Sequence, residues 1–327
     1  MNLQRRPLVL SGLAALAAPG AVLAQPAPGK VWRLGVLSES VPAEPMRGYL
    51  AQFLSAVGYV EGRNLAMDIK YAQSRPELLP GLAAELLAAR PDLLIGLLNR
   101  EIIALKQATT TVPIIMMFAG MPVELGLIAS LARPGGNITG TSSTPPEMAG
   151  KMHQVLRETV PRMSHLASLW DPDYPGMAHY ERYANQAVKL LGLRNTRLPV
   201  RGVADIDAAI AHMERDRPDA VSVASTGVLI DHVGKVIEFA ARQKLPVMYS
   251  VRQSVLRGGL MSYTPDFPAM AQRNAWMIDK IFKGAKPSDI PVEEPARFQF
   301  IINMRTAKAM GLVIPPIVLL QATEVIE

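Results

Sequence analysis

Two acidic residues stand close together where a ligand or a substrate could meet them. Asp171 and Asp173 belong to the sequence DPD, directly after an apolar run that predicts a strand. Carboxylates at this spacing on a loop could act as acid and base, could cap the helix that follows, or could contact an ammonium group of a ligand. The spacing alone does not choose among these three roles.

Serine residues end three other apolar runs, at Ser38, Ser225 and Ser250. A serine hydroxyl becomes a nucleophile only beside a base that an acid orients. The sequence contains no G-x-S-x-G elbow, the turn that exposes the nucleophile in many α/β hydrolases. We therefore expect these hydroxyls to form hydrogen bonds with a ligand, and catalysis has no positive support.

The sequence offers no recognisable site for a metal ion or a cofactor. It contains no cysteine and five histidines, which show neither H-x-x-x-H nor H-E-x-x-H spacing. There is no G-x-x-x-x-G-K-S/T loop, and the glycine-rich stretch 135–140 runs into a predicted strand rather than a helix. Those glycines are typical of turns, and we predict neither a metal nor a cofactor.

Composition and charge restrict the class of protein. The chain has 327 residues, of which 49% are hydrophobic and 19% are charged, so it can bury two cores and is not disordered. It contains 34 Lys and Arg against 28 Asp and Glu, and no basic run is longer than two residues. This mild excess indicates a solvated basic surface, and we predict no nucleic-acid partner.

Residues 1–24 have the three-part pattern of a secretory signal peptide. Arg5 and Arg6 precede an apolar run at 8–18, and residues 22–24 (VLA) fit a cleavage site. The paired arginines resemble a twin-arginine signal, although Sec export fits equally well. An uncleaved anchor is the alternative, but the run is short for a membrane span. We predict export to the periplasm, with no lipid anchor because there is no cysteine.

Short apolar runs alternate with helical periodicity from residue 31 onward, which predicts βαβ units and mostly parallel sheets. In the first half we expect strands at 33–38, 65–71, 93–98, 113–118 and 138–142 and helices at 44–57 and 76–89. In the second half we expect strands at 165–170, 220–225, 246–251, 260–265 and 297–303. We expect helices there at 177–191 and 306–310, and a last short helix from Pro315 towards Ile326.

The two halves repeat the same turn sequences in the same order. Residues 90–92 (RPD) precede a strand in the first half, and residues 217–219 (RPD) precede its counterpart. The helices of both halves end at a glycine, Gly58 and Gly192, as left-handed helix ends require. Two similar α/β lobes follow, and in open α/β sheets ligands bind beyond the carboxyl ends of the strands.

Several longer segments carry a resemblance to a known family. They are 33–37 (RLGVL), 58–64 (GYVEGRN), 131–140 (LARPGGNITG), 257–263 (RGGLMSY), 283–287 (KGAKP), 311–316 (GLVIPP) and 324–327 (EVIE). In this order the segments resemble the ABC transporter substrate-binding family with a type I periplasmic-binding-protein fold. The resemblance extends from about residue 31 to 327.

The resemblance implies two Rossmann-like lobes, joined by a hinge of several strands, that close on a small solute. Characterised members resemble binders of aromatic amino acids and deliver the solute to an ABC permease in the inner membrane. We assign residues 30–141 with 265–291 to the first lobe and 142–264 with 292–327 to the second. We expect the hinge near 141–144, 263–265 and 292–295, and we expect a monomer that is not an enzyme.

Carried over by position, the resemblance implies a binding site at the loops that follow the strands. The implied site residues are Ser38, Glu39, Asn99, Arg100, Gly120, Met121, Ser142, Ser143, Asp171, Tyr174, Thr226 and Ser250. 

Two loops of the implied site depart from the family. Asn99 and Arg100 stand where a small residue, Thr and Pro are frequent, and Met121 stands where Asp is common. The loss of an acid and the gain of a guanidinium favour a solute with a carboxylate, unless Arg100 faces solvent.

A periplasmic sensor for a membrane receptor would have the same sequence features. A hydrolase or racemase, the third alternative, would use Asp171 as one of a pair of acid–base groups.

Overall fold

The computed structural model describes residues 29–143, 145–224 and 226–327. The predicted signal peptide at 1–24, and with it the predicted cleavage site, lies outside these residues. Residues 31–327 form one compact unit, and two separate sheets organise it.

The first sheet has five parallel strands in the order β2-β1-β3-β4-β5. The strands are β1 (Trp32–Ser38), β2 (Leu65–Tyr71), β3 (Leu93–Gly96), β4 (Ile114–Ala119) and β5 (Ile138–Ser142). The three inner strands are buried almost throughout, as expected where helices cover both faces of a parallel sheet.

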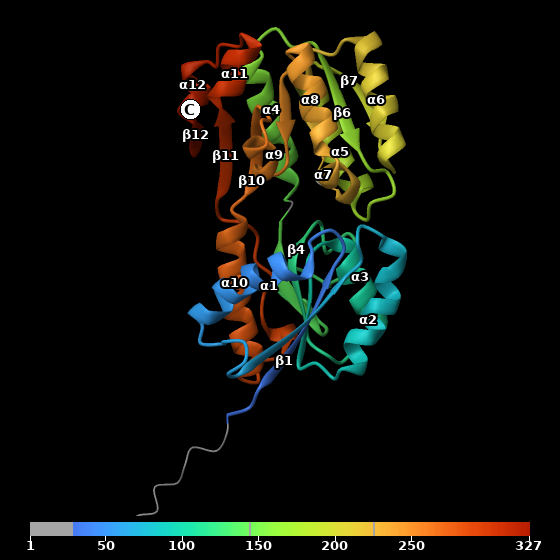
Figure 1. Cartoon of the computed structure of the whole chain (residues 1–327), viewed down its shortest axis with the longest axis vertical. Helices are drawn as coiled ribbons and strands as arrows, with labels where there is room; N and C mark the ends of the chain where they lie inside the picture. The colour runs from blue at the N-terminus through green and yellow to red at the C-terminus, as the bar shows by residue number, and fades with distance from the viewer. Residues whose placement is uncertain (1–28, 144, 225) are drawn as a thin grey trace, which may run out of the picture. The chain divides into compact units, whose positions relative to one another are not determined.

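Helices from distant parts of the sequence cover the first sheet. α1 (Ala43–Ala56) and α10 (Phe267–Phe282) share one apolar cluster with the sheet. A 3₁₀ turn (Pro76–Leu78), α2 (Leu79–Ala88) and α3 (Asn99–Ala108) pack on the other face. Figure 1 shows α10, from the last quarter of the chain, beside α1 at this sheet.

The second sheet has seven strands in the order β12-β11-β10-β9-β8-β6-β7. The strands are β6 (His165–Trp170), β7 (Arg194–Pro199), β8 (Ala220–Val223), β9 (Val247–Tyr249), β10 (Met261–Pro265), β11 (Phe298–Asn303) and β12 (Glu324–Ile326). All neighbours are parallel except β10 and β11, which run antiparallel. The fold class expected from the alternation of elements, α/β with mostly parallel sheets, is confirmed.

The helices of the second sheet enclose the largest apolar cluster. They are α4 (Pro146–Thr159), α5 (Met177–Leu190), α6 (Val203–Asp216), α7 (Gly227–Asp231), α8 (Val233–Gln243), α9 (Arg252–Leu256), α11 (Met304–Met310) and α12 (Pro316–Leu319). We call the first sheet with α1–α3 and α10 the first lobe, and the second sheet with its helices the second lobe.

The connections between the lobes run side by side. The chain passes from β5 to α4, from β10 to α10, and from a 3₁₀ turn (Pro287–Asp289) to β11. Thr141 and Glu293 form an isolated parallel bridge, and the Ser142 amide donates to the Glu293 carbonyl at 2.9 Å. Two crossings are thus hydrogen-bonded to each other. Of the predicted hinge residues, Thr144 lies outside the described ranges.

One predicted element is wrong. The last helix was expected to run from Pro315 towards Ile326, but α12 ends at Leu319 and Glu324–Ile326 is strand β12. The reason is tertiary: β12 pairs in parallel with the edge strand β11, and the Thr323 amide donates to the carbonyl of Phe300. The edge of β11 therefore pairs with residues 324–326 as a strand, although the local sequence predicts a helix there.

Both glycines expected at helix ends have the predicted backbone. α1 is followed by Gly58 at φ +92° and α5 by Gly192 at φ +68°, in the left-handed region that glycine adopts without strain. Within the described residues, no helix is sufficiently long and apolar to cross a membrane.

Candidate functional site

A pocket lies where the carboxyl ends of the strands of both lobes meet. It holds about 700 Å³ of space between protein atoms, the open solvent at its mouth included. Its lining consists of Leu98, Asn99, Phe118, Gly120, Met121, Ser143, Met148, Tyr174, Pro175, Gly176, Met177, Tyr180, Ala224, Ser250, Pro265 and Phe267.

The βα loops of the two sheets supply the walls. Asn99 begins the helix that follows β3, and Met121 follows β4. Across the pocket, Tyr174 follows β6 and Ser250 follows β9. In parallel sheets these loops gather at one edge, so residues far apart in sequence meet there.

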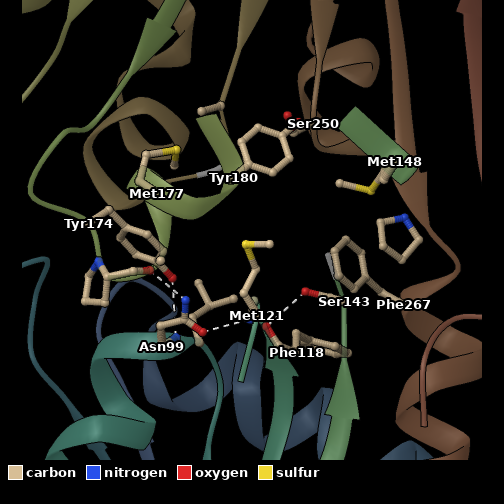
Figure 2. A pocket seen from close by; sticks show the side chains of 16 residues that line it. Asn99, Phe118, Met121, Ser143, Met148, Tyr174, Met177, Tyr180, Ser250 and Phe267 are labelled. Carbon is tan, nitrogen blue, oxygen red and sulfur yellow. Dashed lines mark hydrogen bonds between the residues drawn. The ribbon is translucent and has the colours of Figure 1, made fainter. Parts of the chain in front are cut away.

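Aromatic rings and thioethers dominate the lining (Figure 2). Phe118 and Phe267 meet edge to face, with centroids 4.8 Å apart and planes inclined by 72°. The other members of this group are Tyr174, Tyr180, Met121, Met148 and Met177. Such walls bind a flat apolar group by area and by ring contacts.

The polar side chains of the lining already hold protein partners. Asn99 bridges the lobes, since its Nδ2 donates to the carbonyl of Pro175 at 2.8 Å. Its Oδ1 accepts from the Gly120 amide at 2.7 Å. The Ser143 hydroxyl donates to the Phe118 carbonyl at 3.1 Å, and the Ser250 hydroxyl donates to the carbonyl of Val223 at 2.8 Å. Asn99 therefore fixes the geometry of the walls.

A charged cluster lies behind one wall of the pocket. The Arg100 guanidinium donates to Glu39 at 3.1 Å and to Asp171, in the other lobe, at 3.0 Å. The central carbon of the guanidinium lies 5.1 Å from the ring centroid of Tyr174, which lines the pocket. The side chain of Arg100 is 18% exposed and both carboxylates are almost fully buried. The guanidinium thus joins the two lobes.

Burial changes the proton affinity of several groups in this region. It raises the pKa of Glu39, although Arg100 opposes the change. It raises the pKa of Glu101, which accepts a hydrogen bond from the amide of Glu39, to about 7. Burial also raises the pKa of the Tyr174 phenol, which therefore stays protonated.

Half of the predicted site residues line the pocket, namely Asn99, Gly120, Met121, Ser143, Tyr174 and Ser250. The other half do not line it: Ser38, Glu39, Arg100, Ser142, Asp171 and Thr226, all at least partly buried. Ser38 donates to the carbonyl of Val41 within its own loop, at 2.7 Å. The hydroxyl of Thr226 is buried and has no hydrogen-bond partner among the described residues. Ser225 lies outside the described ranges.

The acidic pair of the sequence is split between two environments. Asp171 accepts from the amide of Asp173 at 3.0 Å and pairs with Arg100. Asp173 is exposed and pairs with Arg201 at 2.9 Å. Neither lines the pocket, and neither caps α5, whose N-cap is Gly176 at φ +87°. The two carboxylates do not face a common reacting centre.

Several lining residues were not predicted from sequence. Met177 and Tyr180 lie on the first turn of α5, and Phe118 lies in the last part of β4. Their positions next to strand ends were a usable signal. Phe267 also lies next to a strand end, two residues after the last residue of β10, and it begins the helix that returns to the first lobe. Among the described residues, no three His, Asp or Glu side chains are grouped so as to hold a metal ion.

The sequence profile described as ABC transporter substrate binding protein matches residues 43–326. The chain belongs to this family. A tyrosine-binding protein from Clostridioides difficile is 24% identical to this substrate-binding protein over 262 residues, which are 78% of this chain and 73% of the relative.

Solved structures agree with the family assignment. A conserved domain protein from Vibrio cholerae has a TM-score of 0.84 at 25% identity and covers 90% of this chain and 100% of its own. An ABC domain from Streptococcus pneumonia in complex with L-Trp has a TM-score of 0.83 at 24% identity, covering 90% and 99%. The fold of this substrate-binding protein is that of the type I periplasmic binding proteins.

Proposed function

We propose that this substrate-binding protein is the solute-binding component of an ABC importer and that its solute contains an aromatic ring. It would work in the periplasm as a monomer and deliver the solute to a permease in the inner membrane. Family membership supports the class of partner. The names of two relatives, a tyrosine-binding protein and a complex with L-Trp, support an aromatic solute.

The observation that carries this proposal is the composition of the pocket walls. Both lobes contribute aromatic and thioether side chains to one cavity, from Phe118 and Phe267 on one side to Tyr174 and Tyr180 on the other. A flat ring between such walls loses water on both faces, which is the main source of affinity for an aromatic ligand.

Closure of the lobes would couple binding to delivery. Contacts that join the lobes are made by Arg100 with Asp171, by Asn99 with Pro175, and by Ser74 with Asp231. Each needs both loops in place, so each favours a closed arrangement over an open one. We propose a hinge at the crossings near 141–144, 263–265 and 292–295, and the lobe boundaries given from the sequence remain a prediction.

The carboxylate expected on the solute needs a different anchor from Arg100. That guanidinium already holds Glu39 and Asp171 and does not line the pocket. A carboxylate that competed for it would have to separate two buried ion pairs, which is costly. The aromatic part of the solute therefore has stronger support than the carboxylate.

The test is to recover the full chain from the periplasm of a Gram-negative host and to identify what it carries. After denaturation, mass spectrometry should find an aromatic compound in near-stoichiometric amount. Added back at a hundredfold excess over Kd, it should stabilise the protein by about 2.7 kcal/mol and raise Tm accordingly.

A pocket-filling variant provides the matched control. Ala224→Phe places a ring inside the cavity and should abolish the shift in Tm, whereas Ala178→Phe adds the same ring on an exposed position of α5 and should preserve it. The proposal fails if no aromatic compound is extracted and none raises Tm in a screen of amino acids, aromatic acids and phenols.

A further inference from the structure

A second, smaller cavity lies beside the pocket, inside the second lobe; we call it the inner compartment. All of its lining residues belong to that lobe, and three of them, Tyr180, Ala224 and Ser250, also line the pocket. Figure 2 shows Tyr180 and Ser250 on the same wall of the pocket. A ring held in the pocket therefore lies next to the inner compartment, and a substituent that passes this wall enters it.

A buried histidine of the inner compartment presents an unused acceptor. His153, on α4, is 4% exposed. Its Nδ1 lies 2.6 Å from the carbonyl oxygen of Ala149, which can only accept, so Nδ1 carries the hydrogen. Burial lowers the pKa of His153, so the ring is neutral at neutral pH and Nε2 carries a lone pair. Nε2 has no hydrogen-bond partner among the described residues.

Two serine hydroxyls of the same lining have already donated their hydrogens. Ser222, on β8, donates to the Oγ of Ser168 on β6 at 3.0 Å. Ser168 in turn donates to the Oδ1 of Asn195 at 2.9 Å. A hydroxyl has one hydrogen and two lone pairs, so both serines can still accept but neither has a hydrogen left for a ligand.

The other polar side chains of the inner compartment are acceptors as well. Ser250 donates to a backbone carbonyl at 2.8 Å, and Tyr180 donates to the sulfur of Met152 at 3.6 Å. Burial raises the pKa of Glu181, but its ion pair with Arg197 at 3.0 Å opposes the change and favours the carboxylate. Among the described residues, the side chains of this lining thus offer acceptors and no free donor.

This inventory determines which group of a solute fits. A buried acceptor without a partner costs free energy, and an incoming O–H or N–H removes that cost. A group that can only accept, such as a carboxylate, would find no side-chain donor there. The one carboxylate of the lining, Glu181, is already balanced by Arg197, so a neutral donor fits better than a second cation.

We propose that the inner compartment receives a hydroxyl or N–H group carried by the aromatic ring of the solute, and that Nε2 of His153 accepts its hydrogen bond. The inference rests on the proposed function, because it specifies the solute of the adjoining pocket. It selects phenols and aryl amines over rings without a donor. His153 is then a specificity-determining residue that contacts the solute.

Three ring substituents of similar size test the choice of solute. Isothermal titration of the full chain at neutral pH would compare tyrosine and 4-aminophenylalanine, whose substituents donate, with 4-fluorophenylalanine, whose fluorine cannot. We expect both donors to bind at least tenfold more tightly, because a site built for a donor disfavours an analogue that lacks it. The same substituents on 3-phenylpropanoate repeat the comparison without the ammonium group. If neither donor is preferred in either series, as when the compartment holds the ammonium group, the inference is overturned.

A variant tests the role of His153. His153→Leu removes the acceptor and keeps an apolar side chain of similar size. The affinity for tyrosine should fall at least tenfold, whereas that for 4-fluorophenylalanine should stay nearly the same, so the preference disappears. His232→Leu, at an exposed histidine, should retain the preference. Equal losses for both ligands in His153→Leu would indicate a structural effect and overturn the assignment of His153.

A measurement on the unaltered chain covers the case in which His153→Leu does not fold. The ¹⁵N resonance of His153 Nε2 should move upfield when tyrosine binds and stay in place with 4-fluorophenylalanine, because only tyrosine donates to that lone pair. No change with tyrosine overturns the assignment.

Failure of this inference and failure of the proposed function give different results. Aromatic solutes that bind equally well with and without a ring donor leave the proposed function intact and overturn only the inference. If none of the six compounds binds, the inference is overturned, and the proposed function still depends on whether an aromatic compound is extracted from the periplasmic protein.

Discussion

Glu101 is the residue whose environment departs most from that of an ordinary carboxylate. It is 1% exposed, its Oε1 accepts from the Glu39 amide at 3.0 Å, and its Oε2 has no hydrogen-bond partner among the described residues. Glu39 and Tyr174 face it from neighbouring loops, and burial raises its pKa from 4.5 to about 7. The folded protein therefore keeps a proton here that the unfolded chain releases.

This difference predicts a loss of stability as pH rises. Below pH 4.5 the folded and the unfolded states both hold the proton, so Glu101 does not lower the free energy of unfolding. Between pH 4.5 and about 7 only the folded state holds it. Over this range the free energy of unfolding therefore falls as pH rises, by at most about 3 kcal/mol. Glu101→Gln should remove this part of the pH dependence in urea unfolding at pH 5 and pH 8. Glu77→Gln, at an exposed carboxylate, should leave it unchanged. A Glu101→Gln variant with the original pH slope would contradict the assignment.

At the scale of elements, the contact between β4 and β5 depends on Gly140. This residue has φ +136°, and a Cβ added to it would collide with the Met116 backbone across the strand pair. The same strand leads into the first crossing between the lobes, so the close approach also sets where Ser143 reaches the pocket.

Gly140→Ala should therefore destabilise the protein by about 3 kcal/mol or more, because it combines a steric clash with a strained backbone. Chemical denaturation followed by circular dichroism would measure the change. Gly136→Ala is the matched control, since that glycine is exposed and has no atom within 4 Å of an added Cβ; its effect should stay within about 0.5 kcal/mol. Equal effects of the two substitutions would count against the packing argument.

At the scale of the whole molecule, the ion pair between Arg100 and Asp171 joins the lobes. Glu39 holds the same guanidinium from within the first lobe. In the closure that we propose, the pair with Asp171 would break when the lobes separate, so its free energy would favour the closed state alone. Arg100 would then act in closure and not through contact with the solute.

Asp171→Asn should lower the affinity for the bound aromatic compound at least tenfold, or about 1.4 kcal/mol, because a larger share of molecules stays open. In the absence of ligand, small-angle X-ray scattering should give a larger radius of gyration for Asp171→Asn than for the unaltered protein. Asp173→Asn removes an exposed pair with Arg201 inside one lobe and should change neither quantity. Unchanged affinity in Asp171→Asn would exclude the pair from closure.

Much of the fold was predictable because its signals are local. The strands at 65–71, 138–142 and 165–170 have the bounds expected from their apolar runs. Strand β7 was not predicted, since its sequence RNTRLP is polar and half-exposed, as an edge strand permits. Local pattern also failed for β12, whose state depends on pairing with β11.

The sequence by itself determined the two α/β lobes, and it predicts that a ligand binds at the loops that follow the strands. Alternating apolar runs and turn residues specify strands and helices within a few positions, and parallel sheets then bring the loops after the strands together. The resemblance to the substrate-binding family, carried over by position, placed Asn99, Met121 and Ser250 in the predicted site, and all three line the pocket. 

Only the tertiary structure decided the electrostatics of the pocket. Asn99 and Arg100 are neighbours in the sequence, but only Asn99 lines the cavity. The side chain of Arg100 is held behind the wall by Glu39 and Asp171. Those acids come from loops about sixty and seventy residues away. A charge interacts with what is near it in space, and distance in space between the loops of two lobes is set by the packing of the whole chain.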